Sequence, residues 1–436
     1  MQELEPNRRE GLLQSANAGG GECVAWSPGA ADPVGDEASM LKTALAEAPL
    51  RISCLRSERE LEALEPQWEL LDKQQSPRTP FTSPAWNLMW WKHLRARGLL
   101  AQDSLCVFAI HDSAGLLVAV APMLTTSRPA KGALRIRELR FFGADANITE
   151  LRGLVCAPRD YDRSLAAILQ VAATSGREWH LVSWSGLRRP PDEWNAAGYP
   201  SLVWRRQITD FCLKLPASWS VFRGNLPRNV RESIRKCYNS LKRDGHVFEL
   251  RIVSKPEGIS AALDILFRLH RARSKAVGTI EHADVFRDGR TRRFLRDYVG
   301  YSAARGEMRI FQLLVGGTVV ATRVGFLLDR DLYLYYSGYD PAWARYSVMT
   351  TGVIEILKWA ILNDVDLVNL STGDDESKTR WRPTRIAYHD AAQRSGTPAW
   401  QTGLAAGEAI FLGLRSGQRS VRRWVAGARA RLLPRS

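Results

Sequence analysis

Two loops of this chain combine residue types and positions that could do chemistry. The first is residues 338–346, Gly-Tyr-Asp-Pro-Ala-Trp-Ala-Arg-Tyr, a turn-rich stretch directly before a predicted helix. The first N–H groups of a helix lack backbone partners and attract anions, so this loop predicts an anion site suited to a pyrophosphate. The second is residues 371–381, Ser-Thr-Gly-Asp-Asp-Glu-Ser-Lys-Thr-Arg-Trp, a polar loop.

The first loop lacks the signatures of the common nucleotide-binding folds. It contains neither a GxGxxG pattern nor a Lys-Ser/Thr pair, which argues against a dinucleotide fold and a P-loop. Any α/β unit contains a loop between a strand and a helix. A purely structural role is therefore the alternative interpretation.

The elements that must position these loops can be read from the hydrophobic pattern. Residues 331–337 alternate in the period of a half-buried strand, and residues 365–370 form a short apolar strand. Between them, residues 347–362 carry apolar side chains at the spacings of three and four that are typical of a helix: Val353, Ile356, Leu357 and Ala360. The expected order is strand, loop, helix, strand, polar loop.

The composition is that of a globular protein with a basic surplus. The chain has 436 residues, 45% of them hydrophobic and 25% charged, which predicts two or three domains with ample core. Its six cysteines are scattered without a CxxC pair, so we expect reduced thiols, a cytoplasmic protein and no metal site. No apolar stretch approaches the roughly 20 residues that span a bilayer, and we see no export signal.

The net charge of +15 points to an anionic partner. The strongest concentration is residues 223–243, with seven basic residues and one acid. An apolar stripe of Val230, Ile234, Tyr238 and Leu241 predicts a helix whose other faces carry the charge. The functional interpretation is a clamp for an anionic substrate, and the plain alternative is a solvated helix face. Exposed aromatic residues that could stack on bases are missing, so nucleic acid is disfavoured.

The second half of the chain repeats the order of the first. The segment from Phe108 through residues 115–120 matches the segment from Phe311 through residues 317–322, and residues 180–185 parallel residues 366–371. We interpret this as a duplication of one α/β domain.

These patterns divide the chain into four parts. Residues 1–50 read as a disordered leader, 51–205 and 206–402 as two α/β domains, and 403–436 as a basic amphipathic helix. The last helix has seven arginines and no acid from residue 415 onward. Packing against a domain and peripheral contact with an anionic membrane are both open for it.

Three stretches together resemble the GNAT-fold acyltransferases of the CelD, or cellulose-biosynthesis, type, which are related to the FemAB aminoacyltransferases. They are residues 226–245 (LPRNVRESIRK…LKRDG), 269–273 (LHRAR), and 336–381 with its two loops. No single motif is specific, but their order and spacing are. The resemblance implies tandem GNAT-like domains with mixed, bent sheets flanked by helices.

The resemblance also implies an acyl-CoA, with acetyl-CoA the first choice, bound where two strands splay apart. Its pyrophosphate would meet the loop before Ser347, with Arg345 and Tyr346 beside it and Ser337 on the preceding strand. The loop departs from the glycine-rich loop of simple GNAT enzymes, and FemAB relatives use aminoacyl-tRNA instead.

The implied chemistry is acyl transfer to an amine or hydroxyl, which needs a base, an acid and donors for the oxyanion. By resemblance, Asp374 or Asp375 would be the base, Tyr339 the acid for the thiolate, and Lys378 the group that holds an anionic substrate or intermediate. The residue before Lys378 is Ser377, where the family usually has Tyr or Phe. We expect the acceptor to be bound by Arg228, Arg231, Arg235, Arg273 and Trp381.

Three functions therefore stand as hypotheses. The first is a cytoplasmic acyltransferase acting on a sugar, a polysaccharide precursor or an amino compound in envelope or exopolysaccharide metabolism. The second is a FemAB-like enzyme that uses aminoacyl-tRNA, with the basic helix contacting the tRNA. The third is a non-catalytic scaffold of a polysaccharide-synthesis complex, held at the inner membrane face by residues 415–436.

Overall fold

The computed structural model describes residues 49–129, 135–145, 147–174, 178–199, 201–276 and 283–394. Apart from residues 49 and 50, the predicted leader lies outside the described residues, and so does the predicted helix 403–436.

The first half of the chain forms a mixed α/β unit. Its elements are β1 (Arg51–Leu55), α2 (Glu58–Asp72), α3 (Pro84–Leu94), β2 (Arg97–Gly98), β3 (Ala101–Leu105), β4 (Val107–His111), β5 (Leu117–Ala121), β6 (Met123–Pro129), β7 (Arg135–Phe141), β8 (Val155–Cys156), α4 (Tyr161–Thr174), β9 (Leu181–Leu187), α5 (Pro191–Ala196) and β10 (Leu202–Lys214).

The second half follows the same plan. Its elements are α6 (Trp219–Gly224), α7 (Arg228–Arg243), β11 (Phe248–Val253), α8 (Pro256–Ser274), α9 (Gly289–Ala304), β12 (Met308–Val315), β13 (Thr318–Leu328), β14 (Asp331–Tyr339), the 3-10 turn η3 (Pro341–Tyr346), α10 (Val348–Leu362), β15 (Leu367–Thr372), α11 (Glu376–Thr379) and β16 (Thr384–Arg394).

Sequence signals explain several of these boundaries. Ser83 caps α3 by accepting a hydrogen bond from the Trp86 N–H at 3.1 Å, with Pro84 at the first helical position. Gly316 and Gly317 both have positive φ, 55° and 77°, which is the requirement of the tight turn that joins β12 to β13. Pro66 does not divide its helix, because α2 runs without interruption from Glu58 to Asp72.

The strand order confirms the duplication. Among the described residues, one sheet has the order β11-β12-β13-β14-β15-β10-β16-β9-β7-β6-β3-β2, and a second has β1-β4-β5-β8. In each half an antiparallel pair (β6–β7 or β13–β14) is followed by a parallel pair (β7–β9 or β14–β15). Each half therefore builds the same bent, mixed sheet.

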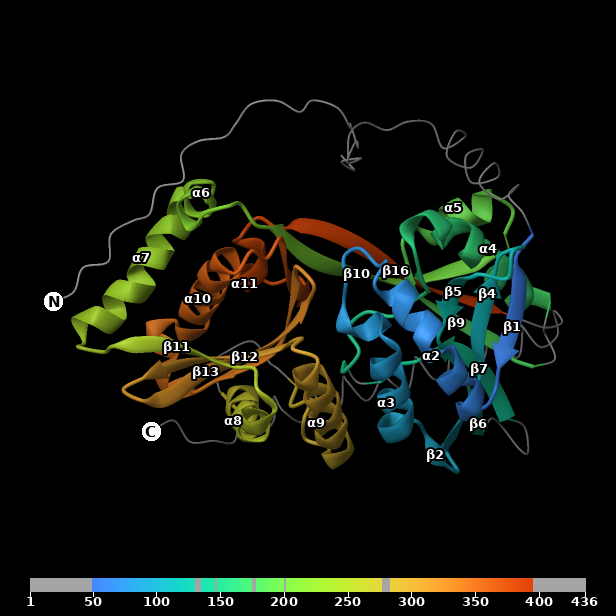
Figure 1. Cartoon of the computed structure of the whole chain (residues 1–436), viewed down its shortest axis with the longest axis horizontal. Coiled ribbons are helices and arrows are strands. Elements are labelled where there is room, and N and C mark those ends of the chain that lie inside the picture. The colour runs from blue at the N-terminus through green and yellow to red at the C-terminus, as the bar shows by residue number, and fades with distance from the viewer. Residues whose placement is uncertain are drawn as a thin grey trace, which may run out of the picture.

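The two halves exchange their last strands. β10 closes the first half in sequence but pairs with β15 of the second, whereas β16 closes the second half and pairs with β9 of the first. β10 and β16 also pair with each other, antiparallel from Leu202–Gln393 to Cys212–Thr384, and run side by side between the halves (Figure 1). The predicted domain boundary between residues 205 and 206 falls within β10.

Helices cover both faces of the part of the long sheet that the second half builds. α8 and α9 lie on one face, where they share an apolar cluster with α3 of the first half, and α7 and α10 lie on the other face (Figure 1). Trp86 of α3 is fully buried in the first cluster, with edge-to-face contacts to Phe294 and Tyr298 of α9. Burial of aromatic side chains from both halves in one core joins them into one body.

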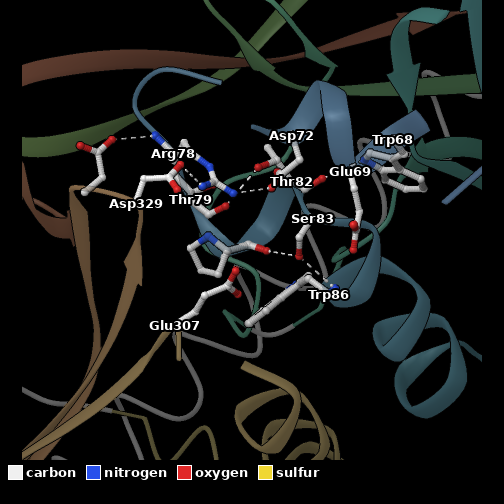
Figure 2. A network of polar contacts seen from close by, with 12 residues as sticks. Trp68, Glu69, Asp72, Arg78, Thr79, Thr82, Ser83, Trp86, Glu307 and Asp329 are labelled. Carbon is white, nitrogen blue, oxygen red and sulfur yellow. Dashed lines mark hydrogen bonds and ion pairs between the residues drawn. The ribbon is translucent and has the colours of Figure 1, made fainter. Parts of the chain in front are cut away.

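A polar network also ties the loop after α2 to the second half. Figure 2 shows Arg78 donating to Asp72 at 3.0 Å and to Asp329, in the β13–β14 turn, at 2.5 Å. The Arg78 N–H also donates to the Asp331 carboxylate at 3.2 Å. Burial raises the pKa of Asp72, and the Arg78 charge opposes that rise.

Candidate active site

The strands β14 and β15 of the second half are neighbours in the 12-stranded sheet and then diverge. They pair in parallel at Asp331–Leu367, Leu332–Val368 and Tyr333–Asn369, and at no later position in the described part of the chain. β14 nevertheless continues to Tyr339 and β15 to Thr372. We call the space between residues 334–339 of β14 and 370–372 of β15 the second fork. It is the strand splay that the resemblance implied.

The N-terminus of α10 lies at the mouth of this fork. Ser347 stands at its N-cap in the left-handed conformation, φ 54° and ψ 40°, and its side chain forms no capping hydrogen bond. The first N–H groups of α10 thus receive no hydrogen bond from the side chain that precedes them. Such a helix terminus is compatible with the predicted anion site, which stays a prediction.

Arg345 and Tyr346 stand directly before Ser347 but differ in exposure. Arg345 is exposed, and its guanidinium stacks 4.6 Å from the Tyr346 ring centroid and donates to the Tyr346 hydroxyl at 2.6 Å. Tyr346 is buried, and its hydroxyl donates to Asp244 at 2.9 Å. Arg345 is the side chain of this pair that an incoming anion can reach.

Lys378 reaches back toward the end of β15. Its ammonium group donates to the carbonyl oxygens of Thr372 and, at 3.2 Å, Gly373, and lies 3.7 Å from the Asp375 carboxylate. The side chain is 13% exposed, and burial lowers its pKa against the opposing charge of Asp375. A cation held so close to the fork can stabilise a negative charge that enters it.

The two neighbouring aspartates have different surroundings. Asp375 caps α11 by accepting from the Ser377 N–H at 2.9 Å. Asp374 is exposed, with its carboxylate 3.9 Å from Arg385. Both remain predicted bases.

The β14 side of the fork carries Ser337 and Tyr339. Arg273, from the end of α8, donates to the Ser337 hydroxyl at 3.3 Å and lies 5.9 Å from the Tyr339 ring centroid. The close approach of α8 requires Gly338, because a Cβ there would lie 2.4 Å from the His270 nitrogen. The structure therefore brings together Ser337, Tyr339 and Arg273 on β14 and α8, and places Lys378 at the end of β15.

The other predicted acceptor-binding residues lie elsewhere. Arg228, Arg231 and Arg235 are on α7, where Arg228 pairs with Glu232 at 2.9 Å and Arg231 donates to the Gly224 carbonyl at 3.1 Å. Trp381 is 3% exposed and donates to the Ser377 carbonyl at 2.8 Å. It lines a cavity of about 430 Å³ together with residues of β10 and α6.

Three ionisable residues at the fork were not predicted. Arg323 of β13 donates to the Leu334 carbonyl at 3.4 Å, and burial lowers its pKa to about 10. Asp210 of β10 accepts from Asn369 at 2.7 Å, and burial raises its pKa to about 6. Glu150 enters from the first half and accepts from Tyr333 at 2.5 Å. A charged residue within an apolar strand pattern was the available signal for Arg323 and Asp210.

The described residues show neither a candidate metal site nor a membrane-spanning helix. They contain no group of three or more His, Cys, Asp or Glu side chains that could hold a metal ion. Among the helices that the structure describes, none is long and apolar enough to cross a membrane.

Comparison with protein families identifies the second half. Residues 228–379 match the family described as "Acetyltransferase (GNAT) domain". This segment contains both strands of the second fork, α10 and Lys378. The matched segment of the second half is thus similar to a GNAT acetyltransferase domain, which supports an acyltransferase. No curated protein matches the chain.

Comparison with solved structures gives distant similarities. One is the C-terminal domain (DUF2156) of a protein described as a lysylphosphatidylglycerol synthetase from Agrobacterium fabrum, with 13% identity, a TM-score of 0.43, and coverage of 81% of this chain and 97% of that one. A tandem GNAT protein from the clavulanic acid biosynthesis pathway has 10% identity, a TM-score of 0.40, and coverage of 80% and 99%. FemX has 10% identity, a TM-score of 0.41, and coverage of 72% and 96%. Similarity at this level identifies neither donor nor acceptor.

Proposed function

We propose that this protein transfers an acyl group, with acetyl the first choice, from acyl-CoA to an amine or hydroxyl within the second fork. The observation that carries the proposal is the divergence of β14 and β15 after Tyr333, directly beside an α10 N-terminus without a side-chain cap. The open edge of β14 offers backbone groups to a pantetheine chain, and the helix terminus offers N–H groups to a pyrophosphate.

The surrounding side chains fit the remaining steps. Arg345 would pair with the pyrophosphate, and Lys378 would stabilise the charge that develops on the carbonyl oxygen. Tyr339 would protonate the leaving thiolate. The acceptor that the CelD-type resemblance implies is a sugar, a polysaccharide precursor or an amino compound, and Arg273 would orient it.

Calorimetric titration with acetyl-CoA tests the proposal. We expect saturable binding that Arg345→Ala weakens about tenfold, or about 1.4 kcal/mol, because a charge-assisted contact is lost. Lys378→Ala should reduce transfer more than binding. Arg330→Ala is the matched control, since Arg330 is an exposed arginine at the opposite end of β14, paired with Asp366. Absence of heat, with a thermal midpoint that no CoA ester moves, would exclude acyl-CoA as the donor.

A second donor, aminoacyl-tRNA, is favoured by the outer face of α7. The predicted apolar stripe packs inward, with Val230, Ile234 and Leu241 buried. Basic side chains on the same helix are exposed: Arg228, Arg235, Lys236, Lys242 and Arg243. A row of exposed cations suits a phosphate backbone. Retention of tRNA that declines steeply with salt, combined with no binding of acetyl-CoA, would favour this donor.

A further inference from the structure

A segment of the first half reaches into the second fork. It belongs to the connection between β7 and β8, and three consecutive contacts hold it against β14. The hydroxyls of Tyr333, Tyr335 and Tyr336 donate to the Glu150 carboxylate, the Ile148 carbonyl and the Asn147 carbonyl, each at 2.5 Å. The segment therefore lies along the strand that forms one wall of the fork.

The same segment is fixed from the side of the first half. Asp145 accepts hydrogen bonds from the N–H groups of Ile148 at 2.6 Å and Thr149 at 3.2 Å. The indole of Trp90 donates to Asp145 at 2.7 Å, and the indole of Trp86 donates to the Thr149 hydroxyl at 3.1 Å. The contacts of residues 145–149 with the first half and the hydrogen bond from Tyr333 to the carboxylate thus together position Glu150.

The Glu150 carboxylate stands where the two strands separate. Tyr333, its hydrogen-bond donor, is the last β14 residue that pairs with β15. Ser371, two residues beyond the β15 partner of Tyr333, lies beside the carboxylate and lowers its pKa. Burial raises the pKa of Glu150, while these hydroxyls and the charges of Lys378 and Arg323 oppose the rise.

The other carboxylates near the fork are less suited to accept a proton from a substrate. Asp375 is engaged as the α11 cap, and Asp374 is directed to Arg385. Asp210 is 0% exposed and bonded to Asn369. Glu150 is held in a fixed position at the point where β14 and β15 separate, beside the charges of Lys378 and Arg323.

We propose that Glu150, supplied by the first half, is the general base of the reaction in the second fork. The inference rests on the proposed acyl transfer and assigns one role within it. The nucleophilic nitrogen or oxygen of the acceptor forms a bond to the acyl carbon, and its proton passes to the Glu150 carboxylate. The bond between that carbon and sulfur breaks, and the CoA thiolate takes a proton from Tyr339 or water.

The competing interpretation is that Glu150 only locks the two halves together through Tyr333. Glu150→Gln separates the two, because glutamine still accepts a hydrogen bond from the Tyr333 hydroxyl but cannot take a proton at neutral pH. Tyr333→Phe is the matched variant, since it removes the hydrogen bond and leaves the carboxylate. Asp374→Asn tests the rival base in the same assay.

The experiment measures three quantities on the full chain: the thermal midpoint, the affinity for acetyl-CoA by calorimetry, and thiol release from acetyl-CoA with glucosamine, hydroxylamine or water as acceptor. For Glu150→Gln we expect release to slow by about 10²- to 10⁴-fold, the usual contribution of a general base, with affinity and midpoint close to wild type. In Glu150→Ala, added formate should restore part of the rate, which a purely structural role would not allow.

Several outcomes would overturn the assignment. Release by Glu150→Gln within threefold of wild type would do so, as would a loss in Asp374→Asn that Glu150→Gln does not show. A lower midpoint in both Glu150→Gln and Tyr333→Phe, with no rescue by formate, would identify a structural lock instead. Failure of the wild-type protein to bind acetyl-CoA would sink the proposed function itself, a result distinguishable from all of these.

Discussion

The two halves of the molecule contain the same strand divergence, but different groups border it. In the first half β7 and β9 pair in parallel at Glu138–Leu181, Leu139–Val182 and Arg140–Ser183 and then separate, as β14 and β15 do. We call this divergence the first fork. The backbone of Arg152 and Gly153 lies against Gly186 of β9 there, and a cavity lined by Phe141, Gly153 and Gly186 adjoins it. The second fork is bordered by ionisable side chains.

The difference arises from the length of one connection. Residues 142–160 separate β7 from α4 in the first half, whereas residues 340–347 separate β14 from α10 in the second. The longer connection crosses the first fork with Arg152 and Gly153 and delivers Glu150 to the second. One longer connection therefore both packs against the first fork and adds a carboxylate to the second.

The largest expected effect concerns Gly186, which lies in the first fork. It has φ +70°, and a Cβ there would lie 1.8 Å from the Arg152 carbonyl oxygen. Gly186→Ala should cost about 3–5 kcal/mol in the free energy of unfolding, because both backbones must move. Urea denaturation measures this cost.

Gly373, after β15 in the second fork, is the matched control. It also has a positive φ, +99°, but a Cβ there would meet only the Lys378 ammonium, at 3.5 Å. Gly373→Ala should cost about 1 kcal/mol, the price of backbone strain alone. Equal losses at the two positions would contradict the contrast between the tight backbone contact at Gly186 and the looser surroundings of Gly373.

The next effect is a gain in stability when Asp210, near the second fork, is replaced by asparagine. Its folded-state pKa, about 6, lies above the ordinary value of 3.8, so the folded protein holds this proton more tightly than the unfolded chain. The contribution of Asp210 to stability should be fully present below pH 4 and fall by about 3 kcal/mol as the pH rises through 6, since each pKa unit corresponds to about 1.4 kcal/mol.

Asp210→Asn should remove that loss. Urea denaturation at pH 4 and pH 7 would then show a variant with a gain at pH 7 and little change at pH 4. A variant that is less stable than wild type at pH 7 would mean that the carboxylate is well paired in the folded protein. The gain would mark the second fork as a place where stability is sacrificed for function.

The smallest effect concerns α7 of the second half. Arg228 is exposed and pairs only with Glu232 within its own helix, so Arg228→Ala should leave the unfolding transition within error of wild type. If tRNA is the donor, the same change should weaken tRNA binding several-fold and reduce its dependence on salt. Filter binding at two salt concentrations measures this; unchanged binding would leave α7 as a solvated helix face.

Local patterns predicted much of the fold. The turn at Gly316-Gly317, the cap at Ser83 and the repeated strand order are encoded within a few residues of the elements they define. The splay of β14 and β15 was expected only through the family resemblance. The exchange of β10 and β16 was not predicted, because antiparallel pairing between strands separated by about 180 residues leaves no local signal.

The residues of the candidate site likewise fall into those that the sequence could place and those that it could not. Lys378 and Ser347 lie beside their own strand or helix, so the order of elements placed them near the second fork. Glu150 lies in a connection of the other half, and only the contacts with Tyr333, Tyr335 and Tyr336 bring it there. Trp381 illustrates the reverse case: a conspicuous residue in the polar loop that packs into the core.

The exchange of final strands governs how the protein can be made. As the ribosome releases the first half, β9 has an unpaired edge, since its partner β16 ends at residue 394. At about 5–20 residues per second, that edge stays open for roughly 10–40 seconds after β9 emerges. An open strand edge invites pairing with other chains, so nascent molecules are exposed to aggregation until synthesis is nearly complete. Neither half can be expressed alone as a finished sheet, whereas two separate fragments that are synthesised together could each supply the strand that the other lacks.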